Sequence, residues 1–399
     1  MGPSHGLQAW GPPLERTWEP DGHRDVRPTW SPGPRITTSG THMHKALTHM
    51  TSSLRFWHRR TPAAPNISAT GGPLHNSALH CVVSVGTGSA VLFAQLLEQK
   101  ADINVLNKEG DSPLHAAICS IGSTVRHAQD AAVKMIKSGR AQTDLRNASQ
   151  DTALTLAAAR HAAAVMGELL GAGADVNAAN NAGDTAAHLA CRSIGGGDAG
   201  GGGAKARSWG PDAAQALLRS SALKLDLANG EGQTALAVLA ASARWFEGAV
   251  GVAGAMVAQS TCTLNNLDKR GLSALHYCLG AGPACGGLSG LGHGPAMALA
   301  LVSSAKCDVD LLSRDNAAEA ALHRVSQLGL PDVCAALLAR GANPNAANGS
   351  GMRPLHLAID GRSEAHSAVA EQLISSDDCD VNIVMPASGQ VRAESCWCM

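Results

Sequence analysis

The sequence predicts an all-α solenoid of about eight helix-turn-helix units linked by β-turns. Three regularities support this fold. A Leu-His pair, intact or altered, recurs along the chain, a glycine and a hydroxyl residue precede it at fixed spacings, and a second apolar pair follows it. A solenoid escapes the size limit of a compact domain, because each unit packs only against its neighbours.

The recurring pair marks the first helix of each unit. It stands at Leu79-His80, Leu114-His115, Leu154-Thr155, Ala187-His188, Leu236-Ala237, Leu275-His276, Leu322-His323 and Leu355-His356. In six units a hydroxyl residue that can cap a helix stands two residues earlier. These residues are Ser77, Ser112, Thr152, Thr185, Thr234 and Ser273, whereas the last two units have Ala320 and Arg353 there. Four residues before the pair, a glycine that accepts the positive φ of a tight turn stands in five units: Gly110, Gly183, Gly232, Gly271 and Gly351.

The second apolar pair marks the second helix of each unit. From this pair to the next Leu-His position the distance is nearly fixed, and it is 18 residues from Leu96 to Leu114, from Leu169 to Ala187 and from Leu337 to Leu355. The distance within a unit varies, from 15 residues after Leu154 to 30 after Ala187. We therefore expect insertions between the two helices of a unit, as in the Gly-rich stretches near residues 195–208 and 280–295.

These units resemble ankyrin repeats, in which a β-turn precedes T-P-L-H-x-A at the start of a first helix and a second helix follows. Asp111–Ala117 matches this motif best, and Leu169–Asn177 and Leu337–Asn345 match the family's L-L-x-x-G-A-D-V-N. The resemblance covers roughly residues 70–385. It implies that the histidine of the pair bonds to backbone of the neighbouring turn, and that insertions leave a groove between turn tips and first helices clear.

The rest of the chain divides into two tails. Residues 1–70 hold four of the seven tryptophans and no lasting apolar period, which predicts a disordered tail. Its basic aromatic cluster, 54–60, is read as solvated, with contact to a membrane, nucleic acid or a partner as the alternative. A start at Met50 would make the next stretch resemble a transit peptide, and metal binding by His42, His44 and His49 is not expected without a nearby cysteine.

The array is assigned to residues 71–385 and a C-terminal tail to 386–399. Asp380-Val381-Asn382 begins another turn, and no ninth helix pair follows. Two readings of the tail stay open. Either it caps the array, or the sequence is cut short there.

Composition excludes several classes of function. The net charge of −1 gives no overall attraction to nucleic acid, and no apolar run reaches the length of a membrane span. The 11 scattered cysteines are typical of reduced thiols in a cytoplasmic or nuclear protein. H-E-x-x-H, a Walker loop and the kinase motifs are absent, so we predict no enzyme, cofactor, metal or small-molecule ligand.

The predicted function is a protein-protein interaction scaffold, or adaptor, that binds partner proteins through the concave groove and the turn tips. For any single tip residue, an ordinary polar turn is an equally good reading. The residues predicted to contact a partner are Asn107, Lys108, Glu109 and Asp111 in one turn, Asn180, Asn181 and Asp184 in another, and Asp268, Lys269 and Arg270 in a third.

A second reading is the substrate-recognition part of a larger enzyme. Asp144–Leu154 and Asn180–Thr185 resemble the ankyrin segment of mind bomb-type ubiquitin ligases. Those ligases also carry RING zinc domains, which require Cys-x-x-Cys pairs, and this chain has none. The chain would then be a fragment, a subunit or a relative without RING domains, and it would not itself transfer ubiquitin.

Overall fold

The computed structural model describes residues 68, 70–71, 74–84, 89–121, 127–194, 212–242, 248–280, 293–315 and 317–382 of the 399-residue chain. Almost all of the predicted tail 1–70, most of both Gly-rich insertions and all of the tail 386–399 lie outside these residues. So do the basic aromatic cluster and the three histidines at 42, 44 and 49. The domain boundaries at 70 and 385 stay predictions.

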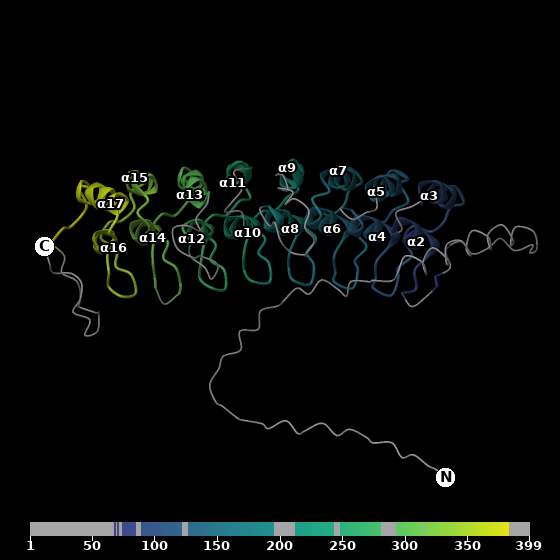
Figure 1. The fold of residues 1–399 in the computed structure, drawn as a ribbon, viewed down its shortest axis with the longest axis horizontal. Helices are drawn as coiled ribbons and strands as arrows, with labels where there is room; N and C mark the ends of the chain where they lie inside the picture. Colours follow the sequence, from purple (N-terminus) through teal and green to yellow (C-terminus); the bar gives the residue numbers. More distant parts are fainter. Residues whose placement is uncertain are drawn as a thin grey trace, which may run out of the picture. The chain divides into compact units, whose positions relative to one another are not determined.

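The described residues form eight helix pairs, numbered here as units 1 to 8 in chain order (Figure 1). The first helices are α2 (Ala78–Ser84), α4 (Pro113–Cys119), α6 (Ala153–Ala159), α8 (Ala186–Ser193), α10 (Ala235–Ser242), α12 (Ala274–Cys278), α14 (Ala321–Leu328) and α16 (Pro354–Asp360). The second helices are α3 (Ser89–Glu98), α5 (Ala128–Lys137), α7 (Ala163–Gly171), α9 (Asp212–Leu218), α11 (Gly248–Ala258), α13 (Gly294–Val302), α15 (Pro331–Ala339) and α17 (Glu364–Ile374).

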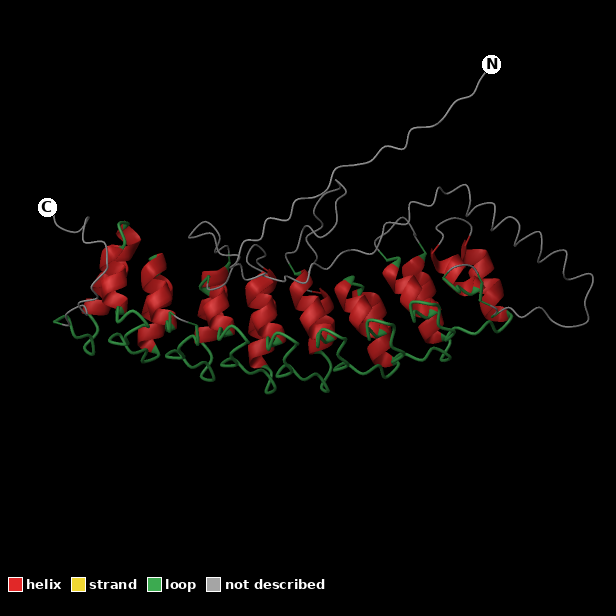
Figure 2. Cartoon of the chain, turned by 90° about the horizontal axis from the view of Figure 1, so that it is seen from below, coloured by secondary structure: helices red, strands yellow, loops and turns green. Residues whose placement is uncertain are grey.

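The helices stand in two layers, one of first helices and one of second helices (Figure 1). Within each layer a helix packs on its counterparts in the neighbouring units, as α8 does on α6 and α10. The turns that join the units lie along one edge of the array (Figure 2). The predicted all-α array of eight units is therefore confirmed for the described residues.

Local sequence explains where each first helix begins. The side chains of Ser112, Thr152, Thr234 and Ser273 accept the backbone N–H three residues on, which is the predicted cap. All five predicted turn glycines have positive φ. Two constraints require a glycine at position 183. Its φ is 75°, and a Cβ there would lie 2.6 Å from the Gly230 nitrogen of the next turn.

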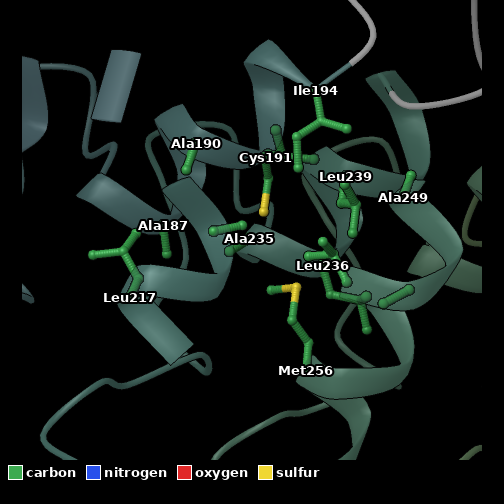
Figure 3. Close-up of a cluster of buried hydrophobic side chains, with 14 of the residues drawn as sticks. Ala187, Ala190, Cys191, Ile194, Leu217, Ala235, Leu236, Leu239, Ala249 and Met256 are labelled. Atoms are coloured by element: carbon green, nitrogen blue, oxygen red, sulfur yellow. The ribbon is translucent and has the colours of Figure 1, made fainter. Parts of the chain in front are cut away.

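Small and branched aliphatic side chains fill the space between the layers. Figure 3 shows this core between units 4 and 5, where Cys191 of α8, Leu236 and Leu239 of α10 and Met256 of α11 come together. Alanines such as Ala190 are also buried there and let neighbouring helices approach closely. Aromatic residues make up only 3% of the chain, which suits this close spacing.

The two expected insertions stay predictions, because almost all of their residues lie outside the described part of the chain. Residues 195–211 fall between α8 and α9, and residues 281–292 fall between α12 and α13. Each first helix starts at its turn and runs away from it, toward the edge of the array opposite the turns (Figure 2). Both ranges therefore fall within a unit and not between units.

Candidate protein-binding surface

The turns between units are tied to one another by backbone hydrogen bonds. We define the turn tips as residues 107–111, 147–151, 180–184, 229–233, 268–272, 313–319 and 348–352. In each tip one backbone N–H donates to a carbonyl of the preceding turn, over 2.7–3.1 Å. The donor and acceptor pairs are Lys108 to Leu74, Ala148 to Glu109, Asn181 to Ser149, Gly230 to Ala182, Lys269 to Glu231, Arg314 to Gly271 and Gly349 to Ala317.

A side-chain ladder strengthens the same edge. In the tip of unit 4, Asn180 Oδ1 accepts the backbone N–H groups of Ala182 and Asp184, each at 3.0 Å. Its Nδ2 donates to Asp151 Oδ1 in the preceding tip at 2.9 Å. One amide thus closes its own turn and holds the turn before it. Asn107, Asn147 and Asn229 repeat this arrangement.

Four anchor histidines join their first helix to the next unit. His188 Nδ1 accepts the Thr185 N–H at 3.2 Å, so the neutral ring carries its proton on Nε2, which donates to the Gln233 carbonyl at 2.9 Å. The predicted structural role is confirmed by the equivalent Nε2 bonds of His80, His276 and His323 to Asp111, Glu319 and Ala346. His366 of α17 makes a similar bond to Gln327 in the preceding unit.

The repeated unit therefore consists of a β-turn, a first helix that begins at the turn and a second helix. The described units have the arrangement that the resemblance to ankyrin repeats implies. No protein-family model matches the chain. It is 33% identical over 173 residues to Neurogenic locus notch homolog protein 1 of Xenopus tropicalis and 32% identical over 173 residues to that of Xenopus laevis. Each match covers 42% of this chain but only 6% of the relative.

One solved structure with which the chain can be compared is the ankyrin repeat domain of Bcl-3, described as a unique member of the IkappaB protein family. The sequence identity is 24%, and the TM-score is 0.47. The alignment covers 67% of this chain and 99% of that one.

The structure separates the ten predicted contact residues of the ankyrin tips into two sets. One set is half-buried or buried and holds the ladder together: Asn107, Asp111, Asn180, Asp184 and Asp268. The other set is exposed: Lys108, Glu109, Asn181, Lys269 and Arg270. Partner contact by either set stays a prediction. The sequence carries a signal for three residues of the first set, because Asn107, Asn180 and Asp268 each stand five residues before a hydroxyl cap.

Two ladder carboxylates carry an additional partner. Asp184, only 2% exposed, accepts from Arg192 Nη1 at 2.5 Å and Nη2 at 3.0 Å, besides Asn229. Asp268 stands where other tips have asparagine, and its Oδ2 accepts from the Tyr277 hydroxyl at 2.5 Å. Burial and this hydrogen bond raise the pKa of Tyr277 to about 12, so the phenol stays a donor. Neither carboxylate is available to a ligand without breaking the ladder.

The first helices contribute an apolar element beside the tips. The residue after the anchor histidine position is apolar and only half-buried in five repeats, namely Cys81, Ala116, Leu156, Leu189 and Leu357. In repeats 5 and 6 its equivalents Val238 and Tyr277 are buried. In repeat 7 the equivalent is the charged Arg324, so the exposed apolar area along the first helices is interrupted at repeats 5 to 7.

The described thiols lack the properties of nucleophiles. None of the eight described cysteines forms a disulfide, and burial raises the pKa of Cys191 and Cys334 to about 12 and of Cys119, Cys262 and Cys307 to about 11. Among the described residues, no group of three His, Cys, Asp or Glu side chains could hold a metal ion. In the same part of the chain, no helix is long and apolar enough to cross a membrane.

Exchanging the two members of one ladder bond tests its contribution to stability. In Asn180→Asp a carboxylate oxygen replaces the Nδ2 donor and faces Asp151. We expect the free energy of unfolding to fall by about 1–3 kcal/mol in urea titrations. Adding Asp151→Asn supplies a donor from the other side and should restore most of the loss. A single variant as stable as the parent, or a double variant that shows no recovery, would contradict this account.

The buried anchor histidines predict that acid weakens the array. Burial lowers the pKa of His80, His115, His188, His276 and His323, so the unfolded chain takes up protons first as the pH falls. Their contribution is complete above about pH 6.5, the pKa of an unfolded histidine, and decreases below it. Urea titrations should give a lower free energy of unfolding at about pH 5.5 than at about pH 7.5.

The matched variant for this pH effect is His188→Gln, which keeps a hydrogen-bonding side chain but removes one titrating group. It should depend less on pH over the same range than the parent chain does. A parent chain equally stable at both pH values, or more stable at the lower one, would show that the histidines do not titrate in this way.

Proposed function

We propose that this chain is a non-enzymatic scaffold that binds partner proteins through its turn tips and the exposed face of its first helices. Extended surfaces of this kind are what repeat arrays use for binding. The proposal places the protein in the cytoplasm or nucleus, in keeping with the described cysteines, none of which forms a disulfide. The groove between tips and first helices is the expected location of the partner.

The observation that carries the proposal is that some tip residues hold the array together while others are exposed. Ladder residues such as Asn180 and Asp184 use their polar atoms inside the array, whereas Asn181 between them is exposed. The exposed side chains are therefore held on a backbone that is already fixed before binding. A preordered surface loses less conformational entropy when a partner binds, which favours recognition.

The exposed tip residues change in character along the array. Lys108 and Glu109 place opposite charges side by side in repeat 2, while the tip of repeat 4 is neutral at Asn181. Repeat 6 exposes Lys269 and Arg270, and the next tip exposes Arg314. The two tips are adjacent, because the backbone N–H of Arg314 donates to the Gly271 carbonyl. The tips of repeats 6 and 7 therefore favour an acidic partner segment, because complementary charge mainly sets the specificity and the rate of association.

The ubiquitin-ligase reading remains an alternative prediction. Among the described residues no side-chain cluster is suited to zinc, and the names of the compared proteins supply no ligase. The scaffold function is preferred because it needs neither a further domain nor a cofactor.

Charge reversal at one pair of tips tests the scaffold proposal. The tagged full chain is used to capture proteins from native lysate, and the captured proteins are quantified by mass spectrometry. Lys269→Glu with Arg270→Glu should reduce at least one reproducible partner by about tenfold, because the new charges repel an acidic segment at the docking site. Lys134→Glu is the matched control, since Lys134 is an exposed lysine on the second helix α5.

Circular dichroism must show the same helix content for all of these chains. Retention of every partner by the tip variant, or equal loss in the Lys134→Glu control, would contradict binding through the tips. A set of partners dominated by ubiquitin-conjugating components and lost in the tip variant would favour the ligase alternative.

A further inference from the structure

The last ankyrin repeat exposes an apolar face that every earlier repeat buries. Four residues after the anchor leucine position, the side chain of α16 is Ile359, which is 66% exposed. Its seven equivalents are at most 3% exposed, because each is covered by the repeat that follows. These equivalents are Val83, Ile118, Ala158, Cys191, Ala240, Leu279 and Ser326.

A second position shows the same contrast. Val381, in the turn that follows α17, is 55% exposed, whereas the matching residues Ile103, Val176, Leu225, Leu264 and Val309 are at most 8% exposed. Leu355, Ile359 and Val381 line a hollow of about 310 Å³ on this face. An exposed apolar surface of this kind marks a contact site.

The turn after α17 makes the same hydrogen bonds that join one repeat to the next elsewhere in the array. Asn177 Oδ1 accepts the Lys224 N–H at 2.9 Å and its Nδ2 donates to the Ala222 carbonyl at 2.8 Å, which ties repeat 4 to repeat 5. Asn345 makes the same pair of bonds in repeat 8. Its Oδ1 accepts the Asp380 N–H at 2.9 Å, and its Nδ2 donates to the Asp378 carbonyl at 2.6 Å. Residues 378–382 therefore stand in the register of a ninth turn.

The sequence that follows keeps this spacing to within one residue. In six repeats the anchor position comes 10 residues after the residue equivalent to Asn382, as from Asn177 to Ala187, and in repeat 7 it comes 12 residues after, from Asp310 to Leu322. Ala393 lies 11 residues after Asn382, and Gly389-Gln390 precedes it as Gly232-Gln233 precedes Leu236. Four residues beyond Ala393 is Trp397, at the position that corresponds to Ile359.

We propose that residues 383–399 of this chain cover the exposed C-terminal face as half of a ninth repeat, supplying a turn and a first helix. Seventeen residues suffice for this half, since Asn177 to Ser193 spans the same length in repeat 4. The segment begins at the face itself, and Ile383, Val384 and Trp397 give it apolar side chains to bury there. Burial of Ile359 and Val381 provides the driving force.

Hydrogen exchange of the full chain, followed by mass spectrometry, tests this docking. Backbone amides of residues 391–398 should exchange at least about tenfold more slowly than an unstructured peptide of the same sequence. Ile359→Asp should abolish this protection, because it places a charge in the docking face. Val91→Asp is the matched control, since Val91 of α3 is also 66% exposed but lies in repeat 1, and it should leave the protection intact.

Each other result overturns the proposal. Exchange of residues 391–398 at the unstructured rate in the parent chain would mean that they do not cover the face. Protection that survives Ile359→Asp would place them elsewhere. Protection of α16 that rises with protein concentration, together with a dimer in sedimentation, would assign the face to a second copy of the chain. The proposed scaffold function would survive all three, because it depends on the tips of repeats 2 to 7.

Discussion

The array depends on an asparagine side chain that serves two turns at once. Asn180 closes its own tip through Oδ1 and holds the preceding tip through Nδ2, and the same geometry recurs at Asn107, Asn147 and Asn229. These bonds turn a series of loops into a connected edge. Because a partly buried amide left without its partners is destabilising, each repeat favours the register of its neighbour. The positions of the exposed tip residues follow from that register.

Where the asparagine is missing, other contacts join the turns. The tip of repeat 7 is longer, and Ser313 there accepts the Glu319 N–H and donates to Asp315 within its own turn. The backbone bonds on either side, from Arg314 to Gly271 and from Gly349 to Ala317, remain. The backbone ladder is thus independent of side-chain identity, and it lets degenerate repeats stay in the array.

Most of the fold could be predicted from the sequence, because spacing alone locates caps, turns and both helices of every repeat. The structural role of the anchor histidines was predicted from the resemblance to ankyrin repeats. The tip residues could not be sorted so well. Asp184 and Lys269 are both polar turn residues in the sequence, and only the distances to Asn229 and Arg192 show that the first is part of the interior. The exposure of Ile359 was also beyond the sequence, since burial there depends on what the next repeat provides.

The central claim is that the tips are as firmly ordered as the helices they join. Native-state hydrogen exchange at low denaturant concentration measures this directly. The backbone amides of Asp184 and Gln233, which the ladder asparagines accept, should open with a free energy within about 1 kcal/mol of helix amides in α8 and α10. Exchange of these two amides at nearly the rate of an unfolded chain, while the helices stay protected, would contradict it.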